Sequence, residues 1–153
     1  MISIDWHQLE KNSESSPQEF FESFNYQIAV KKFGTYGNFS YFYNTPGSEF
    51  YLTLTKDCNE LSAQSGDIIG WQVKYWFNNT DPDNSPLGSQ HRAELIEGFK
   101  KSLEYKPGIK TWIVCTPGLF SNTAPHYPVN SLERDIKHVK LDINILYWQK
   151  PNY

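Results

Sequence analysis

The stretch that decides the fold runs from residue 46 to residue 76 and reads PGSEFYLTLTKDCNELSAQSGDIIGWQVKYW. Its two ends have the patterns of short β-strands, and the polar, turn-rich residues 56–67 between them predict a hairpin excursion. Successive side chains of a strand point to opposite faces, so Gln72 and Lys74 share a face of the second strand. If the two strands pair, these side chains and Glu49 of the first strand meet at one end of a sheet.

The other face of each strand is apolar and is expected to form the core. On the first strand this row is Phe50, Leu52 and Leu54, and on the second it is Ile69, Trp71, Val73, Tyr75 and Phe77. A simpler interpretation of Gln72 and Lys74 stays open, because polar residues at every second position are also typical of a sheet face exposed to water.

The rest of the chain predicts an α/β fold with a mixed sheet. A helix should begin at Pro17, since Ser16 suits the N-cap and Glu19 completes a capping box. The further predicted elements are a strand at 39–44, a helix at 90–105, a buried strand at 111–116, a helix within 131–140 and a strand within 141–148. The resulting order, α-β-β-β-α-β followed by a C-terminal piece, favours a mixed sheet with helices packed on it.

An acidic residue followed by Gln-x-Lys on the next strand resembles the Mrr-like branch of the PD-(D/E)XK nuclease superfamily. The longer pattern P-G-x-E-F-Y, G-W-Q-x-K, a long helix and W-I-V-C-T-P is similar to N-terminal nuclease domains of bacterial antiviral STAND NTPases, over roughly residues 1–125. The resemblance implies a restriction-endonuclease-like core with a mixed central β-sheet flanked by helices. It also implies that residues 1–153 form a single nuclease domain, the N-terminal part of a longer chain.

The resemblance further implies a Mg²⁺-dependent DNA endonuclease, in which Mn²⁺ could replace Mg²⁺. Its substrate would be double-stranded DNA, and it would act as the effector of a cytoplasmic antiphage defence protein that forms homo-oligomers through the remainder of the chain. Glu49 would be the main carboxylate ligand, Gln72 would add its side-chain oxygen and Val73 its carbonyl. Lys74 would orient the attacking water and stabilise charge on the phosphate, and Glu22 would be an outer partner.

Two departures from the family pattern keep an alternative open. Glu49 stands where the superfamily more often has Asp, and Gln72 lacks the negative charge of a second acid, which weakens metal binding. The alternative is therefore a catalytically inactive nuclease-fold module for protein interaction or oligomerisation. A nuclease directed at RNA is a further alternative that the sequence does not separate from one directed at DNA.

Composition limits the function classes further. The chain has 153 residues, a formal net charge of −3 and a pI of about 5.8, whereas a non-specific nucleic-acid-coating protein is usually basic. Cys58 and Cys115 have no neighbouring Cys or His at the spacing of a zinc site. No apolar run approaches the length of a membrane span, which fits the expected cytoplasmic location.

The remaining candidates have simpler interpretations. Asp67 is a rival acid, although a Gly-Asp pair at the start of a strand is more often part of a turn. The four histidines, His7, His91, His126 and His138, are scattered and are expected to be surface or packing residues. Lysines 100, 101, 106 and 110 fit an exposed face, with a path for DNA phosphates as the alternative.

Overall fold

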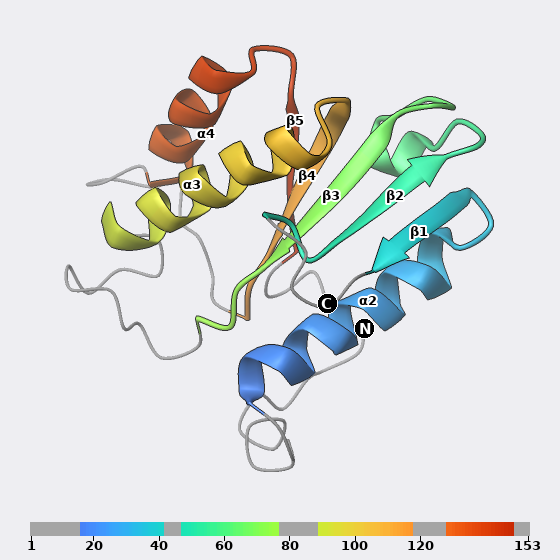
Figure 1. Ribbon diagram of the computed structural model, residues 1–153, viewed down its shortest axis with the longest axis horizontal. Helices are drawn as coiled ribbons and strands as arrows, with labels where there is room; N and C mark the ends of the chain where they lie inside the picture. Colours follow the sequence, from blue (N-terminus) through green and yellow to red (C-terminus); the bar gives the residue numbers. More distant parts are fainter. Residues whose placement is uncertain (1–15, 42–46, 77–88, 118–127, 149–153) are drawn as a thin grey trace.

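The computed structural model describes residues 16–41, 47–76, 89–117 and 128–148 (Figure 1). Within these residues, five strands form one mixed sheet with helices on both faces (Figure 1). The strands are β1 (Gly37–Tyr41), β2 (Phe50–Leu54), β3 (Ile68–Val73), β4 (Ile109–Cys115) and β5 (Asn144–Trp148). The helices are α2 (Pro17–Phe33), α3 (Ser89–Tyr105) and α4 (Pro128–Val139), with a short 3₁₀ helix at Asn59–Leu61.

The strands lie in the sheet in chain order, from β1 to β5. The first three pair antiparallel, which short connections allow, and β4 and β5 run parallel to β3. A parallel pair needs a crossover, and α3 occupies the one between β3 and β4, while α4 lies between β4 and β5 in the chain. The chain is thus α/β with a mixed sheet, as the sequence predicted.

Two apolar layers hold the helices to the sheet. The layer under α2 contains the predicted row of the first hairpin strand and that of the second as far as Tyr75. Trp71 stacks there on Phe50 with ring centroids 4.9 Å apart. The layer under α3 and α4 includes Leu95 and Phe99 of α3 and Trp112 of β4. As the alternating pattern predicted, successive residues of β3 face opposite sides of the sheet. The odd-numbered apolar residues face α2, and the even-numbered positions face α3.

The start of α2 agrees with the sequence in detail, because the Ser16 hydroxyl accepts a hydrogen bond from the Glu19 N–H at 3.1 Å. One row of α2 is buried against the sheet. The buried residues are Phe21, Asn25, Ala29 and Phe33, a strict four-residue spacing. Phe20, next to this row in the chain, is 40% exposed.

The strand predicted at 39–44 begins earlier, at Gly37, and residues 42–44 lie outside the described residues. Phe77, predicted for the apolar row of the second hairpin strand, also lies outside them. Gly37 allows the early start because a Cβ there would lie 2.1 Å from the Thr53 carbonyl oxygen. The hairpin excursion contains buried anchors, Cys58 and Leu61, at 2% and 1% exposure. Among the described residues, no helix is both long enough and apolar enough to cross a membrane.

Candidate functional site

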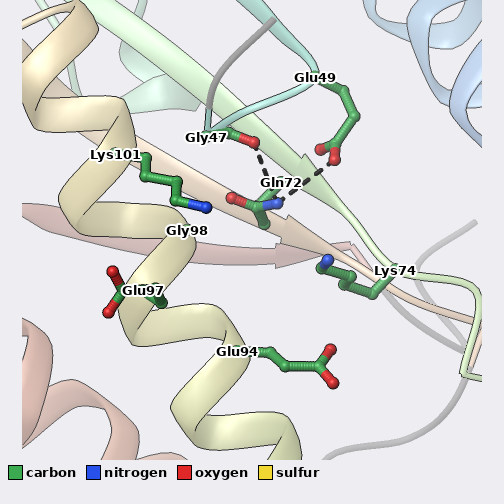
Figure 2. Close-up of a pocket in the computed structure, with 8 residues that line it drawn as sticks. All are labelled: Gly47, Glu49, Gln72, Lys74, Glu94, Glu97, Gly98 and Lys101. Carbon is green, nitrogen blue, oxygen red and sulfur yellow. Dashed lines mark hydrogen bonds between the residues drawn. The ribbon is translucent and has the colours of Figure 1, made fainter. Parts of the chain in front are cut away.

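The candidate site lies where the start of β2 meets the end of β3. The Glu49 N–H donates to the Trp71 carbonyl at 2.8 Å, so strand pairing continues to the residue just before β2. Gln72 Nε2 lies 3.3 Å from Glu49 Oε1 and 3.3 Å from the Gly47 carbonyl oxygen (Figure 2). The hairpin therefore brings Glu49 and Gln72 into contact.

Lys74 lies at the same end, in a pocket of about 330 Å³ between the hairpin and α3. The pocket is lined by Gly47, Glu49, Gln72, Lys74, Glu94, Glu97, Gly98 and Lys101. In Figure 2 the Lys101 ammonium group and the Glu94 carboxylate extend over the pocket from α3, whereas the Glu97 carboxylate turns aside. Thus α3 adds charged groups that the strand pattern alone does not indicate.

Gln72 is buried, at 2% exposure, so the interpretation of its face as exposed to water is wrong. The reason is the close approach of α3. A Cβ at Gly98 would lie 2.7 Å from Gln72 Oε1, so only glycine fits there without moving the amide. Among the residues that the structure describes, Gln72 Oε1 has no hydrogen-bond partner.

Glu49 has an unusual electrostatic environment. Burial raises its pKa from 4.5 to about 8, although the Val73 N–H donates to Oε2 at 2.5 Å and opposes the shift. The Glu22 carboxylate raises the pKa further, and the Lys74 ammonium lowers it. Burial also raises the pKa of Glu22, against the effect of a hydrogen bond from Gln18. The end of β3 beside Glu49, called the corner below, thus has three groups whose charges interact: the Glu49 and Glu22 carboxylates and the Lys74 ammonium.

A buried serine pair fixes the turn that carries Glu49. The Ser48 N–H donates to Ser102 Oγ at 2.8 Å, and the two hydroxyl oxygens are also 2.8 Å apart. Both serines are fully buried, and Gly47 precedes them with φ of +79°. A Cβ at Gly47 would lie 2.4 Å from the Ser102 nitrogen, so α3 packs directly on the turn. This contact sets the distance between Glu49 and the α3 wall of the pocket.

Asp67, His91 and His138 do not line the pocket of the candidate site. Asp67 lies at the opposite end of β3, where Oδ2 accepts the Gln64 N–H at 2.8 Å, which is turn chemistry. His91 is buried and stacks on Trp76 with ring centroids 3.8 Å apart, as expected of a packing residue. His138 lies in a separate groove between α3 and α4. His7 and His126 lie outside the described residues.

The lysine cluster is divided by the fold. Lys101 lines the candidate site, whereas Lys100 lines the groove between α3 and α4. Lys110 forms an ion pair with Asp142 at 3.1 Å, near the opposite end of β4. The Lys106 ammonium lies over the Tyr105 ring, 5.3 Å from its centroid. Of the four lysines, Lys101 alone lines the pocket with Lys74.

The donor atoms at the corner fit a hard cation better than a soft one. The Glu49 carboxylate and the Gln72 amide oxygen are oxygen donors, which Mg²⁺ prefers. In the part of the chain that the structure describes, no three His, Cys, Asp or Glu side chains gather into a metal-binding group. The Val73 carbonyl already accepts a hydrogen bond from Gln18 Nε2 at 2.8 Å. This hydrogen bond does not support Val73 as a metal ligand, and that role stays a prediction.

Comparison with known families gives no assignment for the site. No protein-family model matches this chain, and no curated protein shows significant similarity to it.

Proposed function

We propose that the chain is a Mg²⁺-dependent endonuclease that hydrolyses phosphodiester bonds in double-stranded DNA. The observation that supports this best is the contact between Glu49 and Gln72 in a pocket that Lys74 also lines. A carboxylate, an amide and an ammonium group at the junction of two antiparallel strands are the groups that the PD-(D/E)XK resemblance requires. Glu49 precedes Gln72 by 23 residues and Lys74 by 25, and the hairpin brings them together.

The arrangement of elements is in keeping with this proposal. One helix, three antiparallel strands, a helix and a parallel strand follow in the order expected from the resemblance. A restriction-endonuclease-like core is accordingly the proposed fold family.

Glu49 and Gln72 would hold the Mg²⁺ ion. Bound there, the ion would neutralise charge on the phosphate and ease ionisation of the attacking water. Two features of the residues suit a cation. Desolvation raises the pKa of the half-buried Glu49 carboxyl to about 8, so its ionised form would gain from a neighbouring positive charge, and the Gln72 amide oxygen has no partner among the described residues. The oxygen and nitrogen of an amide exchange places by rotation, so Gln72 can turn its oxygen toward Glu49.

Lys74 provides the positive charge for the phosphate. Its ammonium group affects the pKa of both Glu49 and Glu22, so it lies within electrostatic reach of each. A donor fixed near the developing charge stabilises a transition state without reorganisation. Lys101, on the opposite wall, would contact the same phosphate or the adjacent one.

Cleavage of supercoiled plasmid by the purified chain tests the proposal. With Mg²⁺ or Mn²⁺ we expect nicking or linearisation, and about 100-fold less with Glu49→Ala or Lys74→Ala, or with EDTA. Lys137→Ala and Glu104→Ala, exposed on α4 and α3, are matched controls that should cleave normally. Equal cleavage by Glu49→Ala and wild type would contradict the proposal, and an RNA of the same sequence separates the two substrates.

A second candidate is an inactive nuclease-fold module for protein interaction or oligomerisation. The Gln72 amide nitrogen faces Glu49, so the two side chains satisfy each other without a cation. This candidate predicts that Mg²⁺ neither supports cleavage nor raises the melting temperature. Metal-dependent stabilisation that Glu49→Ala abolishes would argue against it.

The net charge of −3 is compatible with an effector domain of a longer defence protein. An acidic nuclease grips DNA weakly alone, and assembly of several copies would raise its effective concentration on the substrate. Homo-oligomerisation through the remainder of such a chain is part of the proposal. Cleavage that rises when the domain is fused to a trimeric coiled coil would support this part.

A further inference from the structure

Strand β3 continues beyond its partner at the candidate site. β2 begins at Phe50, opposite Trp71, and Glu49 makes the last backbone contact of the pair. On the other edge, the Lys74 N–H donates to the Cys115 carbonyl of β4 at 2.9 Å. The backbone groups of Val73 and Tyr75 therefore face the side where β2 has ended.

Side chains replace the missing strand there. Glu49 Oε2 accepts the Val73 N–H, and Gln18 of α2 contacts the next two backbone groups. Gln18 Nε2 donates to the Val73 carbonyl at 2.8 Å, and Gln18 Oε1 accepts the Tyr75 N–H at 2.7 Å. One amide thus bridges the residues on both sides of Lys74, as the N–H and C=O of one residue in a parallel neighbouring strand would.

The same amide also contacts the second carboxylate of the corner. Gln18 Nε2 donates to Glu22 Oε1 at 2.9 Å, one helical turn further along α2. Both hydrogens of the amide nitrogen and one lone pair of its oxygen are therefore used. A side chain with three fixed contacts has one allowed orientation, and it transmits that orientation to its partners.

We propose that Gln18 is a positioning residue of the site, which holds the backbone on both sides of Lys74 and orients Glu22. This inference rests on the proposed function, because Lys74 and Glu22 matter to catalysis only if the chain is a nuclease. Among the described residues, Gln18 forms no hydrogen bond with the Glu49 side chain and does not line the pocket.

Gln18→Leu is the informative variant, because it keeps the side-chain volume and removes all three hydrogen bonds. Asn25→Ala is the matched control: it removes a buried hydrogen bond to the Phe21 carbonyl in the same helix, away from the site. Gln27→Leu, at an exposed position of α2, controls for the change of residue type.

Two measurements decide the inference. In Gln18→Leu we expect at least about tenfold faster hydrogen exchange of the Tyr75 amide and a displaced Lys74 side-chain NMR signal, neither of which occurs in the controls. In the cleavage assay we expect kcat to fall to about one tenth of the wild-type value or below, with KM within about threefold of wild type. Misplacement of a catalytic group affects the chemical step more than substrate binding. Asn25→Ala, although destabilised, should keep its kcat.

The inference is overturned if Tyr75 exchange and the Lys74 signal of Gln18→Leu match those of Asn25→Ala, or if both variants cleave equally well. If Gln18→Leu does not fold, Gln18→Glu is the deciding variant. It keeps an acceptor for the Tyr75 N–H but loses both hydrogen bonds that Gln18 donates. In this variant only the Lys74 signal and kcat should change. Exchange requires no activity, so it decides the positioning of Lys74 even if the wild type does not cleave. A wild type that does not cleave even when it is fused to a trimeric coiled coil would reject the nuclease proposal.

Discussion

Replacing Glu49 with glutamine should make the protein more stable at high pH and flatten the dependence of its stability on pH. Glutamine is neutral and has nearly the shape of protonated glutamate, so it retains an oxygen for the Val73 N–H. The difference between the two proteins is then the free energy of ionising residue 49 in its half-buried position.

The sign and the size follow from the pKa. Burial raises the pKa of Glu49 from 4.5 to about 8, so between these values the folded protein keeps a proton that the unfolded chain has released. Stability of the wild type therefore falls as pH rises through this window and is constant, as far as Glu49 is concerned, below and above it. At about 1.4 kcal/mol per pH unit, the total loss is on the order of 5 kcal/mol.

Urea denaturation at intervals from pH 5 to pH 9 measures the effect. An offset at pH 5 reports any misfit of the glutamine, and only the growth of the difference between the two proteins with pH tests the reasoning. Glu104→Gln, an exposed change on α3, should run parallel to wild type. Parallel curves for Glu49→Gln and wild type would show that Glu49 is well solvated. Saturating Mg²⁺ should reduce the slope of the wild type alone, because a cation favours the ionised carboxylate.

Two further substitutions test the contact between α3 and the hairpin. Gly98→Ala should lower stability by about 1–3 kcal/mol by displacing the Gln72 amide, although alanine in a helix interior normally stabilises by about 0.5–1 kcal/mol; a more stable variant in urea denaturation would contradict the close approach. Ser102→Ala should lower stability by about 1–3 kcal/mol because it leaves the buried Ser48 N–H without its acceptor, and thermal unfolding against Ser65→Ala, an exposed change, measures the difference.

The hairpin half of the site could be predicted from the sequence because two short-range regularities determine it. The alternation on each strand assigns Glu49 and Gln72 to one face, and the polar segment between the strands requires them to pair antiparallel. Register then follows from matching the apolar rows, and the observed pairing of Phe50 with Trp71 agrees with this. None of these steps needs information from outside residues 46–76.

The α3 half of the site could not be predicted in the same way. The helical period shows that Leu95 and Phe99 face the sheet, but not which strand they cover or how closely. The position and angle at which α3 crosses the sheet decide two features of the site. Gly98 is needed for the contact with Gln72, and Lys101 lines the pocket. A glycine inside a strong helical pattern was the one available signal, since such a residue often marks a close approach.

Gln18 had no such signal, and the reason lies in how the sheet ends. A strand that outruns its neighbour exposes backbone groups, which must find partners if they are to be buried. At the end of β3 those partners are the side chains of Glu49 and Gln18, so the residues that complete the sheet are also those that surround Lys74. A substitution that removes Gln18 or Glu49 therefore alters both the end of the sheet and the candidate site. If the chain is the proposed nuclease, only measurements that separate kcat from unfolding can assign the effect of such a substitution.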